Sequence, residues 1–554
     1  MDANADRFPV WDGELYLQYH RGTLTSVARN KANNRRAERE MKELEYLCAM
    51  ATVLSRDVPY PSAKIAEFWD IILINQFHDI LPGTSIAEVY KDSDAEYDSL
   101  FAALESANGP RQVAAAALSK PNAGQLTLFN FTSQNRDAEL VNFVGHAKAL
   151  QVGRDKQAMQ KVFGADGTVG SCAPMPRVPP LGWATAQLSD VSVPIPQTKL
   201  SVSTSHLEND FLKVVFDKAG EITSVIDKLH ERELIAPGKT ANALIAYEDK
   251  PRHWDAWDID RSFDEQFWPL ANEPKNIEVL ETGPYRAAIR IERTYASSKI
   301  VQVISLQDGA RQVEFDTYID WQERQTLLKT LFPLDLNTSE IRSEVQFGHV
   351  VRATHRNTSW DQARYEASMH RWVDMSEPDF GAALLNDCKY GYDAVGQMVR
   401  MTLLKSPVDP YPDADLGEHR MRYALKLHDG LFDLAQVVLA AERFNNPISV
   451  IGETRLMAGE TDHKPASFSF ANVDRDNVTL ETLKKAQDGA DLILRVFEHA
   501  NKRTSATIKF GIPIAKVQKV NLMEEGGDPV AVIDNAVTLD LRPFEISTLR
   551  ITPI

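Results

Sequence analysis

The chain has 554 residues, a length that predicts several domains because a single hydrophobic core rarely grows to that size. Its formal net charge of −17 argues against a nucleic-acid or anionic-membrane partner, since both are themselves negatively charged. With 43% hydrophobic and 25% charged residues, the composition is that of a globular protein and excludes a disordered or collagen-like chain.

The sparse cysteines indicate a reducing compartment. Cys48, Cys172 and Cys388 are an odd set, far apart in sequence, without the spacing of a metal site or a disulfide framework. Residues 1–7 are polar and cannot form the apolar core of a signal peptide. Together these features predict a soluble, cytoplasmic protein.

The first regular pattern is a short alternation of apolar and more polar residues. Leu15, Leu17 and Tyr19 alternate with their neighbours, which predicts a strand over residues 13–19 and then a loop that contains Gly22. A lone strand leaves its backbone groups unpaired unless more of a sheet accompanies it. We therefore expect residues 1–29 to belong to a larger domain.

Residues 30–120 carry helical patterns that predict a three-helix bundle. The first helix, over about 33–54, combines an apolar stripe with a charged face at 36–42, which we expect to be solvated. The second follows Pro61 and ends before Pro82.

The third helix of the bundle is expected to begin at Ser85. Ser85 and Glu88 have the spacing of a capping box, in which each side chain accepts a hydrogen bond from the other residue's backbone amide. The pattern continues to Gly109.

After Pro121 the hydrophobic period changes from 3.6 to 2, for example over 313–321 and 492–496. This pattern, interrupted by turn residues, predicts antiparallel sheets in sandwich form. The domains that we expect in this part of the chain are a small β domain at 121–200, a large β-sandwich at 201–450 and a C-terminal β domain at 451–554.

One dense polar cluster, residues 75–85, stands at the end of the second helix and reads Asn-Gln-Phe-His-Asp-Ile-Leu-Pro-Gly-Thr-Ser. His78 in this cluster has two possible roles. It could be a helix-terminal histidine that donates to the last carbonyls and interacts with the helix dipole. It could equally be one ligand of a zinc ion whose other ligands come from elsewhere, and spacing alone leaves both open.

The cluster at 75–85 resembles the second-helix motif of glycoside hydrolase family 38, the α-mannosidases. Residues 13–29 resemble the last strand and loop of that family's catalytic barrel, although His20 to Thr23 could also form a structural turn. The segments similar to its cytosolic subgroup are 254–259, 355–360, 385–393, 442–447 and 543–550.

This resemblance implies a zinc-dependent, retaining hydrolase of terminal α-D-mannosides that acts on mannose-containing oligosaccharides. It implies that His78 closes the zinc site and that Asp79 lines the sugar pocket. In the family, zinc holds the 2- and 3-hydroxyls of mannose, and two aspartates act as nucleophile and acid/base. Those aspartates and the remaining ligands belong to the barrel and have no match here, so no catalytic residue is assigned in this chain.

The expected architecture is therefore a multidomain α+β fold: a remnant of the catalytic α/β barrel at 1–29, the helix bundle, and the β domains. We expect a truncated chain that is inactive alone. The alternative is a non-catalytic carbohydrate-binding or scaffold module. His253-Trp254-Asp255 has the H-x-D spacing of a zinc motif, but its flanks match a different family segment and favour a structural role.

Overall fold

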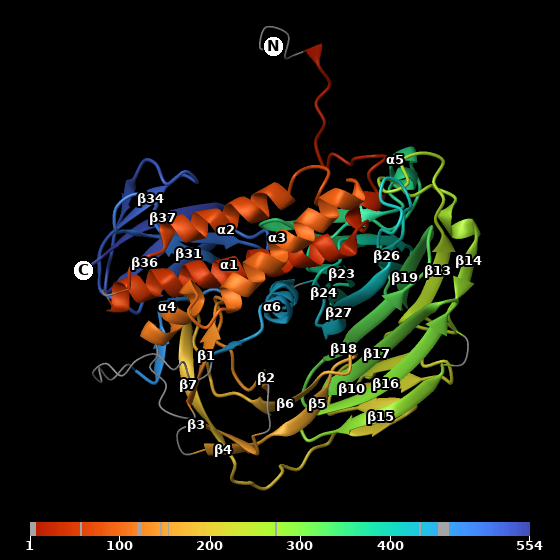
Figure 1. Cartoon of the computed structure of the whole chain (residues 1–554), viewed down its shortest axis with the longest axis horizontal. Helices are drawn as coiled ribbons and strands as arrows, with labels where there is room; N and C mark the ends of the chain where they lie inside the picture. The colour runs from red at the N-terminus through yellow and green to blue at the C-terminus, as the bar shows by residue number, and fades with distance from the viewer. Residues whose placement is uncertain are drawn as a thin grey trace.

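The computed structural model describes residues 7–55, 58–118, 125–143, 147–152, 155–271, 274–431, 434–451 and 465–554. Helices near the start are followed by antiparallel sheets, which confirms the multidomain α+β fold (Figure 1). The described residues contain no closed barrel.

The helical part has one helix more than the sequence predicts. Its members are α1 (Ala28–Ser55), α2 (Ser62–Asn75), α3 (Ala87–Glu105) and α4 (Pro110–Leu118). Helix α4 begins with a proline, which is favourable at the first helical position because no intrahelical hydrogen bond is lost there. It buries Ala114, Ala115 and Leu118, and it packs against α1.

The large sandwich occupies the middle of the chain and is built from three sheets. The nine-stranded sheet has the spatial order β15 (Asn276–Thr282), β16 (Arg286–Tyr295), β17 (Ser298–Gln307), β18 (Gln312–Trp321), β27 (Gly417–His428), β24 (Gly381–Asn386), β23 (Trp372–Ser376), β20 (Glu340–Val345) and β21 (Gly348–Ala353). The six-stranded sheet has the order β14 (Phe267–Pro269), β13 (Ala243–Glu248), β19 (Thr326–Pro333), β26 (Met398–Lys405), β25 (Gly391–Val395) and β22 (Ala367–Ser368). The five-stranded sheet has the order β12 (Arg232–Glu233), β11 (Ile222–Asp227), β10 (Leu212–Phe216), β9 (His206–Glu208) and β8 (Ser201–Ser203).

Strand β18 shows why the period-2 pattern was informative. Every second residue, from Val313 to Trp321, is buried, and the residues between them are partly exposed. Alternate residues of a strand face opposite sides of the sheet, so one face of β18 enters the core. The strand predicted at 313–321 is thus confirmed.

Two smaller β regions flank this sandwich. The first comprises β28 (Ser449–Ile451), β1 (Gln125–Asn130), β7 (Gly182–Ser189), β3 (Ala149–Val152), β4 (Asp155–Ala158) and β29 (Ser467–Ser469), with a separate sheet of β2 (Leu140–Phe143), β6 (Val169–Pro174) and β5 (Gln160–Phe163). The second comprises β31 (Val478–Lys485), β32 (Leu492–Glu498), β37 (Ile546–Pro553), β34 (Ile514–Val520) and β35 (Asp528–Val530), with a separate sheet of β30 (Ala471–Val473), β33 (Thr504–Phe510) and β36 (Ala536–Leu541).

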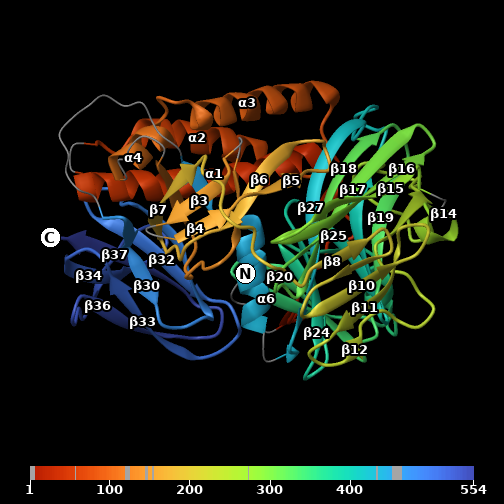
Figure 2. The same cartoon turned by 90° about the horizontal axis from the view of Figure 1, so that it is seen from below.

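The helices and the C-terminal β region share a single hydrophobic core. This core includes Leu44 and Leu47 of α1 together with Leu480, Leu494 and Ile551 from the C-terminal strands. A second core fills the large sandwich. Figure 2 shows α6 (Leu434–Asn445) between the C-terminal strands and the large sandwich, with the helices along one side. Helix α1 therefore links parts of the chain that are far apart in sequence.

The strand predicted over 13–19 is wrong. Residues 11–20 have no strand structure, because no described strand lies beside them to pair with their backbone. The segment is instead held by side chains. Glu14 forms an ion pair with Arg352 at 2.5 Å, and the Tyr16 hydroxyl donates to the Glu366 carbonyl at 2.5 Å.

Two expectations about the helices have different outcomes. Most of the charged face at 36–42 is at least partly solvated, as predicted: the Arg36, Arg39 and Lys42 side chains are 40%, 30% and 45% exposed. Within it Glu40 is buried, and it forms ion pairs with Arg36 and Arg39. The capping box does not form, since α3 begins at Ala87 and the Ser85 hydroxyl donates to the Asp79 carbonyl instead.

The ion pair of Glu14 gives a test of what holds the segment at 7–20. Its hydrogen bond to Arg352 lowers the pKa of the Glu14 carboxyl, so the stabilisation is present above the ordinary pKa of about 4.5 and is lost as the pH falls through the folded value. We expect Glu14→Gln to cost about 1 kcal/mol of local stability and to speed limited proteolysis of this segment about fivefold at pH 7.

The matched control is Asp12→Asn, because the Asp12 carboxylate forms no ion pair with any described residue. Equal cleavage rates of the two variants at neutral pH would contradict a holding role for Glu14. Global thermal unfolding should change little in either, since Asp12 and Glu14 lie outside the helices and strands.

Candidate functional site

The polar cluster forms a turn that presents two exposed side chains. Helix α2 ends at Asn75, and the Gln76 backbone amide closes it by donating to the Ile72 carbonyl at 3.0 Å. Beyond it, the His78 and Asp79 side chains are 75% and 45% exposed, with Nε2 and Oδ2 3.2 Å apart. The pair is therefore available to a ligand or to another part of the protein.

Asp79 is oriented by hydrogen bonds from residues that follow it in the chain. Its Oδ1 accepts a hydrogen bond from the Thr84 hydroxyl at 2.9 Å, and its backbone carbonyl accepts bonds from Ser85 and Tyr90. One carboxylate oxygen is thus held by the turn, while the other faces His78. This arrangement fixes the direction in which the carboxylate can accept further hydrogen bonds.

Side chains at two positions along helix α1 form hydrogen bonds with the turn. The Lys31 ammonium is buried and donates to the Ser26 carbonyl at 2.6 Å and to the Leu81 carbonyl at 2.8 Å. Further along the helix, the Gln76 amide donates to Asn34 at 3.0 Å and to Glu38 at 2.8 Å. The two ends of the turn are therefore tied to the same helix.

Gly83 allows the turn to approach the segment before α1. Its φ of +91° favours glycine, and a Cβ at this position would lie 2.2 Å from the Ser26 carbonyl oxygen. Backbone packed this closely leaves the turn little room to shift.

The segment at 21–26 rests in turn on the loop that contains the H-x-D sequence. The Gly22 amide donates to the Trp257 carbonyl at 2.8 Å, and the Ser26 hydroxyl donates to the Ala256 carbonyl at 2.6 Å. Arg21 and Asp258 form a buried ion pair at 2.9 Å. Residues 254–258 are thus a support for the turn-bearing region, as the structural interpretation of this sequence predicted.

Gly22 is required by close packing. A Cβ there would lie 2.6 Å from Lys405 and 2.9 Å from the Ala256 carbonyl oxygen. Of the two interpretations of residues 20–23, the structural turn is the one that these contacts support.

The start of α1 is fixed by a carboxylate from the large sandwich. Asp415 accepts hydrogen bonds from the Val27 amide at 2.8 Å and from the Ala28 amide at 2.7 Å, one to each oxygen. Burial raises the pKa of Asp415 and lowers the pKa of Lys31, and the attraction between the two charges opposes both shifts. This network positions α1, the helix that supports the turn.

The described contacts of His78 do not support the capping interpretation. His78 lies three residues past the end of α2, and among the described contacts its ring meets Asp79 and Phe77 but no helix carbonyl. Asp255 accepts bonds from the Val408 and Asp409 amides, so its carboxylate is engaged in holding a loop.

The described part of the chain does not complete a metal site. No group of three or more His, Cys, Asp or Glu side chains within it could hold an ion. A zinc site needs about three or four such donors, and the turn offers His78 with Asp79 beside it. On their own these residues do not fit a resident zinc ion.

Several large apolar side chains are exposed at residues 8–19, at the end of α2 and in the turn, and at Trp254 and Trp360. The exposed residues are Phe8, Val10, Trp11, Leu15, Leu17, Tyr19, Leu73, Ile74, Phe77, Trp254 and Trp360. Trp11 and Trp360 contact each other with ring centroids 5.2 Å apart. Figure 1 shows the N-terminal segment projecting away from the body of the protein.

Three family models match successive parts of the chain: the alpha mannosidase middle domain at 18–109, the C-terminal domain of glycosyl hydrolases family 38 at 207–413, and the C-terminal beta sandwich domain of that family at 477–549. Alpha-mannosidase 2C1 of Homo sapiens is 31% identical over 99% of this chain. The chain belongs to glycosyl hydrolase family 38.

Family 38 relatives are longer than this chain. The match covers 51% of the human protein, and alpha-mannosidase G of Dictyostelium discoideum is 29% identical over 99% of this chain and 53% of its own length. The chain thus spans about half the length of the curated relatives it matches. A solved alpha-mannosidase from Enterococcus faecalis V583 has a TM-score of 0.77 at 15% identity, over 96% of this chain and 68% of that one, which shows the shared fold.

Sequence reasoning missed the residues that support the turn. Lys31 and Asp415 are far apart in sequence, and neither belongs to a recognisable motif. Gln76 belongs to the polar cluster at 75–85, which the sequence did mark. Its hydrogen-bond partners on α1, Asn34 and Glu38, carried no such signal. Nothing in the pattern of charges marked Lys31 as buried.

Gly83 provides a test of how tightly the turn is held. We expect Gly83→Ala to destabilise the turn by more than the 1–2 kcal/mol or so of a left-handed alanine, because the new methyl group would collide with backbone. Amide hydrogen exchange of residues 76–84 should become faster.

Gly167→Ala is the matched control, since Gly167 has a φ of +86° and open space around its Cβ position. It should lose about the cost of the left-handed conformation alone. If both variants lose the same stability, close contact with Ser26 does not constrain the turn.

Proposed function

We propose that this chain forms part of a zinc-dependent α-mannosidase that removes terminal α-D-mannose from glycans or oligosaccharides. The observation that carries the proposal is the exposed His78–Asp79 pair on a firmly supported turn, in a chain similar over nearly all its length to proteins named α-mannosidases. The hydrolysis would follow the retaining scheme, with one carboxylate as nucleophile and one as acid/base.

His78 would supply one ligand to a zinc ion that the whole enzyme completes with donors from outside this chain. An exposed imidazole suits this role, because its Nε2 could exchange Asp79 for a metal without burying an unpaired group. Zinc would act as a Lewis acid and orient the sugar hydroxyls. Asp79, one oxygen of which is held by Thr84, would accept a hydrogen bond from the sugar.

The exposed apolar side chains would form the contact with the catalytic barrel of the whole enzyme. Trp11, Leu15, Leu17 and Tyr19 are exposed, in the segment that Glu14 and Tyr16 attach to the large sandwich. Contiguous exposed apolar surface marks a protein interface. The barrel and the His78 turn would meet there.

A cytoplasmic location is part of the same proposal. All three cysteines are free and buried, which suits a reducing compartment. Burial raises the pKa of the Cys48 thiol to about 12, and a protonated thiol resists oxidation. None of the described helices is long and apolar enough to cross a bilayer.

The alternative is a non-catalytic module that binds carbohydrate or acts as a scaffold. This alternative needs no metal, and the described residues contain no group of three or more possible metal ligands. Reading the DNA upstream of the first codon separates the two: an in-frame H-x-D segment with barrel strands supports the enzyme, and a stop codon with a promoter supports the module.

The chain by itself should not hydrolyse α-mannosides. We expect the purified 554-residue protein, assayed with a chromogenic α-mannoside and added zinc, to show no more turnover than its His78→Ala variant. The physical reason is that one histidine cannot define a zinc coordination shell. Turnover well above that of the variant would contradict the proposed division of the active site.

In the full-length enzyme, His78→Ala should lose the bound zinc and lower kcat/KM by more than about 100-fold, the upper end of what residues around the ligands contribute. Asp79→Asn should retain zinc and lose less activity, because it removes a sugar contact only. Since both side chains are exposed, stability should change by about 0.5 kcal/mol or less.

Bound zinc, kcat/KM and thermal unfolding should be measured for both variants beside the parent enzyme. His206→Ala on β9, remote from the turn in sequence, serves as a control for removing a histidine. A His78→Ala enzyme with a full zinc equivalent and near-normal turnover would refute the metal assignment.

A further inference from the structure

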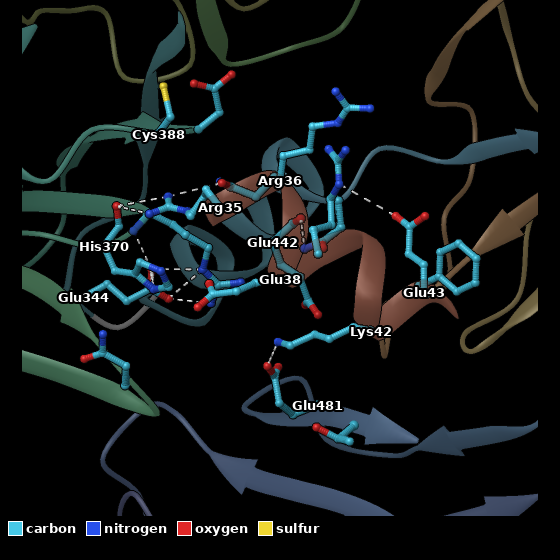
Figure 3. Close-up of a pocket in the computed structure, with 18 of the residues that line it drawn as sticks. Arg35, Arg36, Glu38, Lys42, Glu43, Glu344, His370, Cys388, Glu442 and Glu481 are labelled. Atoms are coloured by element: carbon cyan, nitrogen blue, oxygen red, sulfur yellow. Dashed lines mark hydrogen bonds and ion pairs between the residues drawn. The ribbon is translucent and has the colours of Figure 1, made fainter. Parts of the chain in front are cut away.

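A polar cavity of about 540 Å³ lies where α1, the large sandwich, α6 and the C-terminal sheet meet. We call it the α1 chamber and define it by six lining residues, Arg35, Glu38, Lys42, His370, Glu442 and Glu481. Figure 3 shows Lys42 extending from α1 to an ion pair with Glu481 on β31. Its volume is within the range of small-molecule sites.

Segments that the sequence marked but the proposed function does not use converge on this chamber. Glu442, Asn445 and Asn446 come from the family-like segment at 442–447, and Asp387 with Cys388 comes from 385–393. Gln76 joins them from the His78 turn. Three segments distant in sequence thus contribute polar groups to one cavity.

Two charged groups in the chamber lack a partner of opposite charge. Arg35 is buried, donates to the His370 carbonyl at 3.2 Å and to the Asn445 side chain at 3.3 Å, and has no carboxylate within ion-pair distance among the described residues. Glu442 is 6% exposed, and among the described contacts its carboxylate accepts one hydrogen bond, from the Gln134 side-chain amide at 3.1 Å.

This situation is unusual inside a protein, where buried charges are normally paired. Elsewhere in the same chamber the rule is followed, since Arg371 and Glu344 form an ion pair at 2.5 Å. Arg35 and Glu442 therefore offer a guanidinium and a carboxylate, each without an ion-pair partner among the described residues, to whatever fills the cavity.

Other lining groups add donors and apolar surface. Lys42 keeps 45% of its side chain exposed, although its surroundings lower its pKa to about 8 through burial. Trp69 lines the chamber with an aromatic ring that is only partly buried, and the buried Tyr46 hydroxyl has no hydrogen-bond partner in the described structure. Donors, acceptors and aromatic rings are thus interspersed around the chamber.

This combination fits a small neutral polyhydroxyl compound. Each sugar hydroxyl can donate to a carboxylate and accept from a guanidinium or ammonium at the same time. Its apolar ring face can pack on an aromatic side chain. A phosphate ion fits less well, although Arg36, Arg39, Arg371, Arg420 and Arg422 also line the cavity. Each of these arginines is already paired with a carboxylate, and the unpaired carboxylate of Glu442 would repel an anion.

We propose that the α1 chamber is a second carbohydrate site that binds a mono- or disaccharide between Arg35 and Glu442. The site goes beyond the proposed function and needs no catalysis. The chamber adjoins the His78 turn, because Glu38 in its lining accepts the hydrogen bond from the Gln76 side-chain amide. A sugar that competes for Glu38 would therefore loosen one support of the turn.

The test is titration calorimetry of the purified chain with D-mannose, α-linked mannobiose and, as a third probe, inorganic phosphate. We expect saturable binding of at least one sugar and none of phosphate. Glu442→Gln should weaken sugar binding at least tenfold, because an amide is a weaker acceptor than a carboxylate. Glu67→Gln, an exposed surface acid on α2, should bind as the parent does.

His78→Ala distinguishes sugar binding in the α1 chamber from sugar binding at the His78 turn. Because His78 does not line the chamber, this variant should bind sugar as the parent does. Lys42→Met is a second chamber variant in case Glu442→Gln unfolds early, as thermal unfolding would reveal. No sugar binding, phosphate binding alone, or binding that is lost in His78→Ala and kept in both chamber variants would each overturn the proposal. These outcomes leave the zinc assignment untouched, since that is measured by metal content and kinetics of the full-length enzyme.

Discussion

Helix α1 starts where the Asp415 carboxylate accepts the amides of Val27 and Ala28, and much of the structure depends on this contact. The first amides of a helix have no partner inside it, and a carboxylate satisfies them while interacting favourably with the helix dipole. Asp415 belongs to the large sandwich, so the contact fixes the direction of a helix of 28 residues against that domain. Lys31, one turn further on, then holds the His78 turn.

A helix anchored in this way connects two sites. Its first half supports the turn through Lys31, Asn34 and Glu38, and its middle lines the α1 chamber. Its second half packs into a core shared with the C-terminal strands. Of the charged residues at 35–43, Arg35, Glu40 and Glu43 are buried, and Arg36, Arg39 and Lys42 are partly exposed. Ion pairs or hydrogen bonds meet most of them. The chamber is where this matching is incomplete.

Much of the architecture could be predicted, because it depends on local periodicity. The alternation in β18 and the apolar stripes of the helices follow from which face meets a core. The exceptions have a common cause. Residues 13–19 alternate like a strand but have no partner strand among the described residues. The Ser85 hydroxyl donates to the Asp79 carbonyl, and α3 begins at Ala87 without a side-chain cap.

By itself, the sequence determined the α+β class, the order of helices before sheets, and the motif at 75–85 that marks His78 and Asp79. These are encoded over short stretches, where hydrophobic period and residue type suffice. Only the tertiary structure decided that His78 is exposed beyond its helix, that Lys31 and Asp415 hold the turn in place, and that the charged face of α1 encloses a chamber. Those features arise from residues up to several hundred positions apart, and a local pattern carries no information about which distant charge will lie opposite.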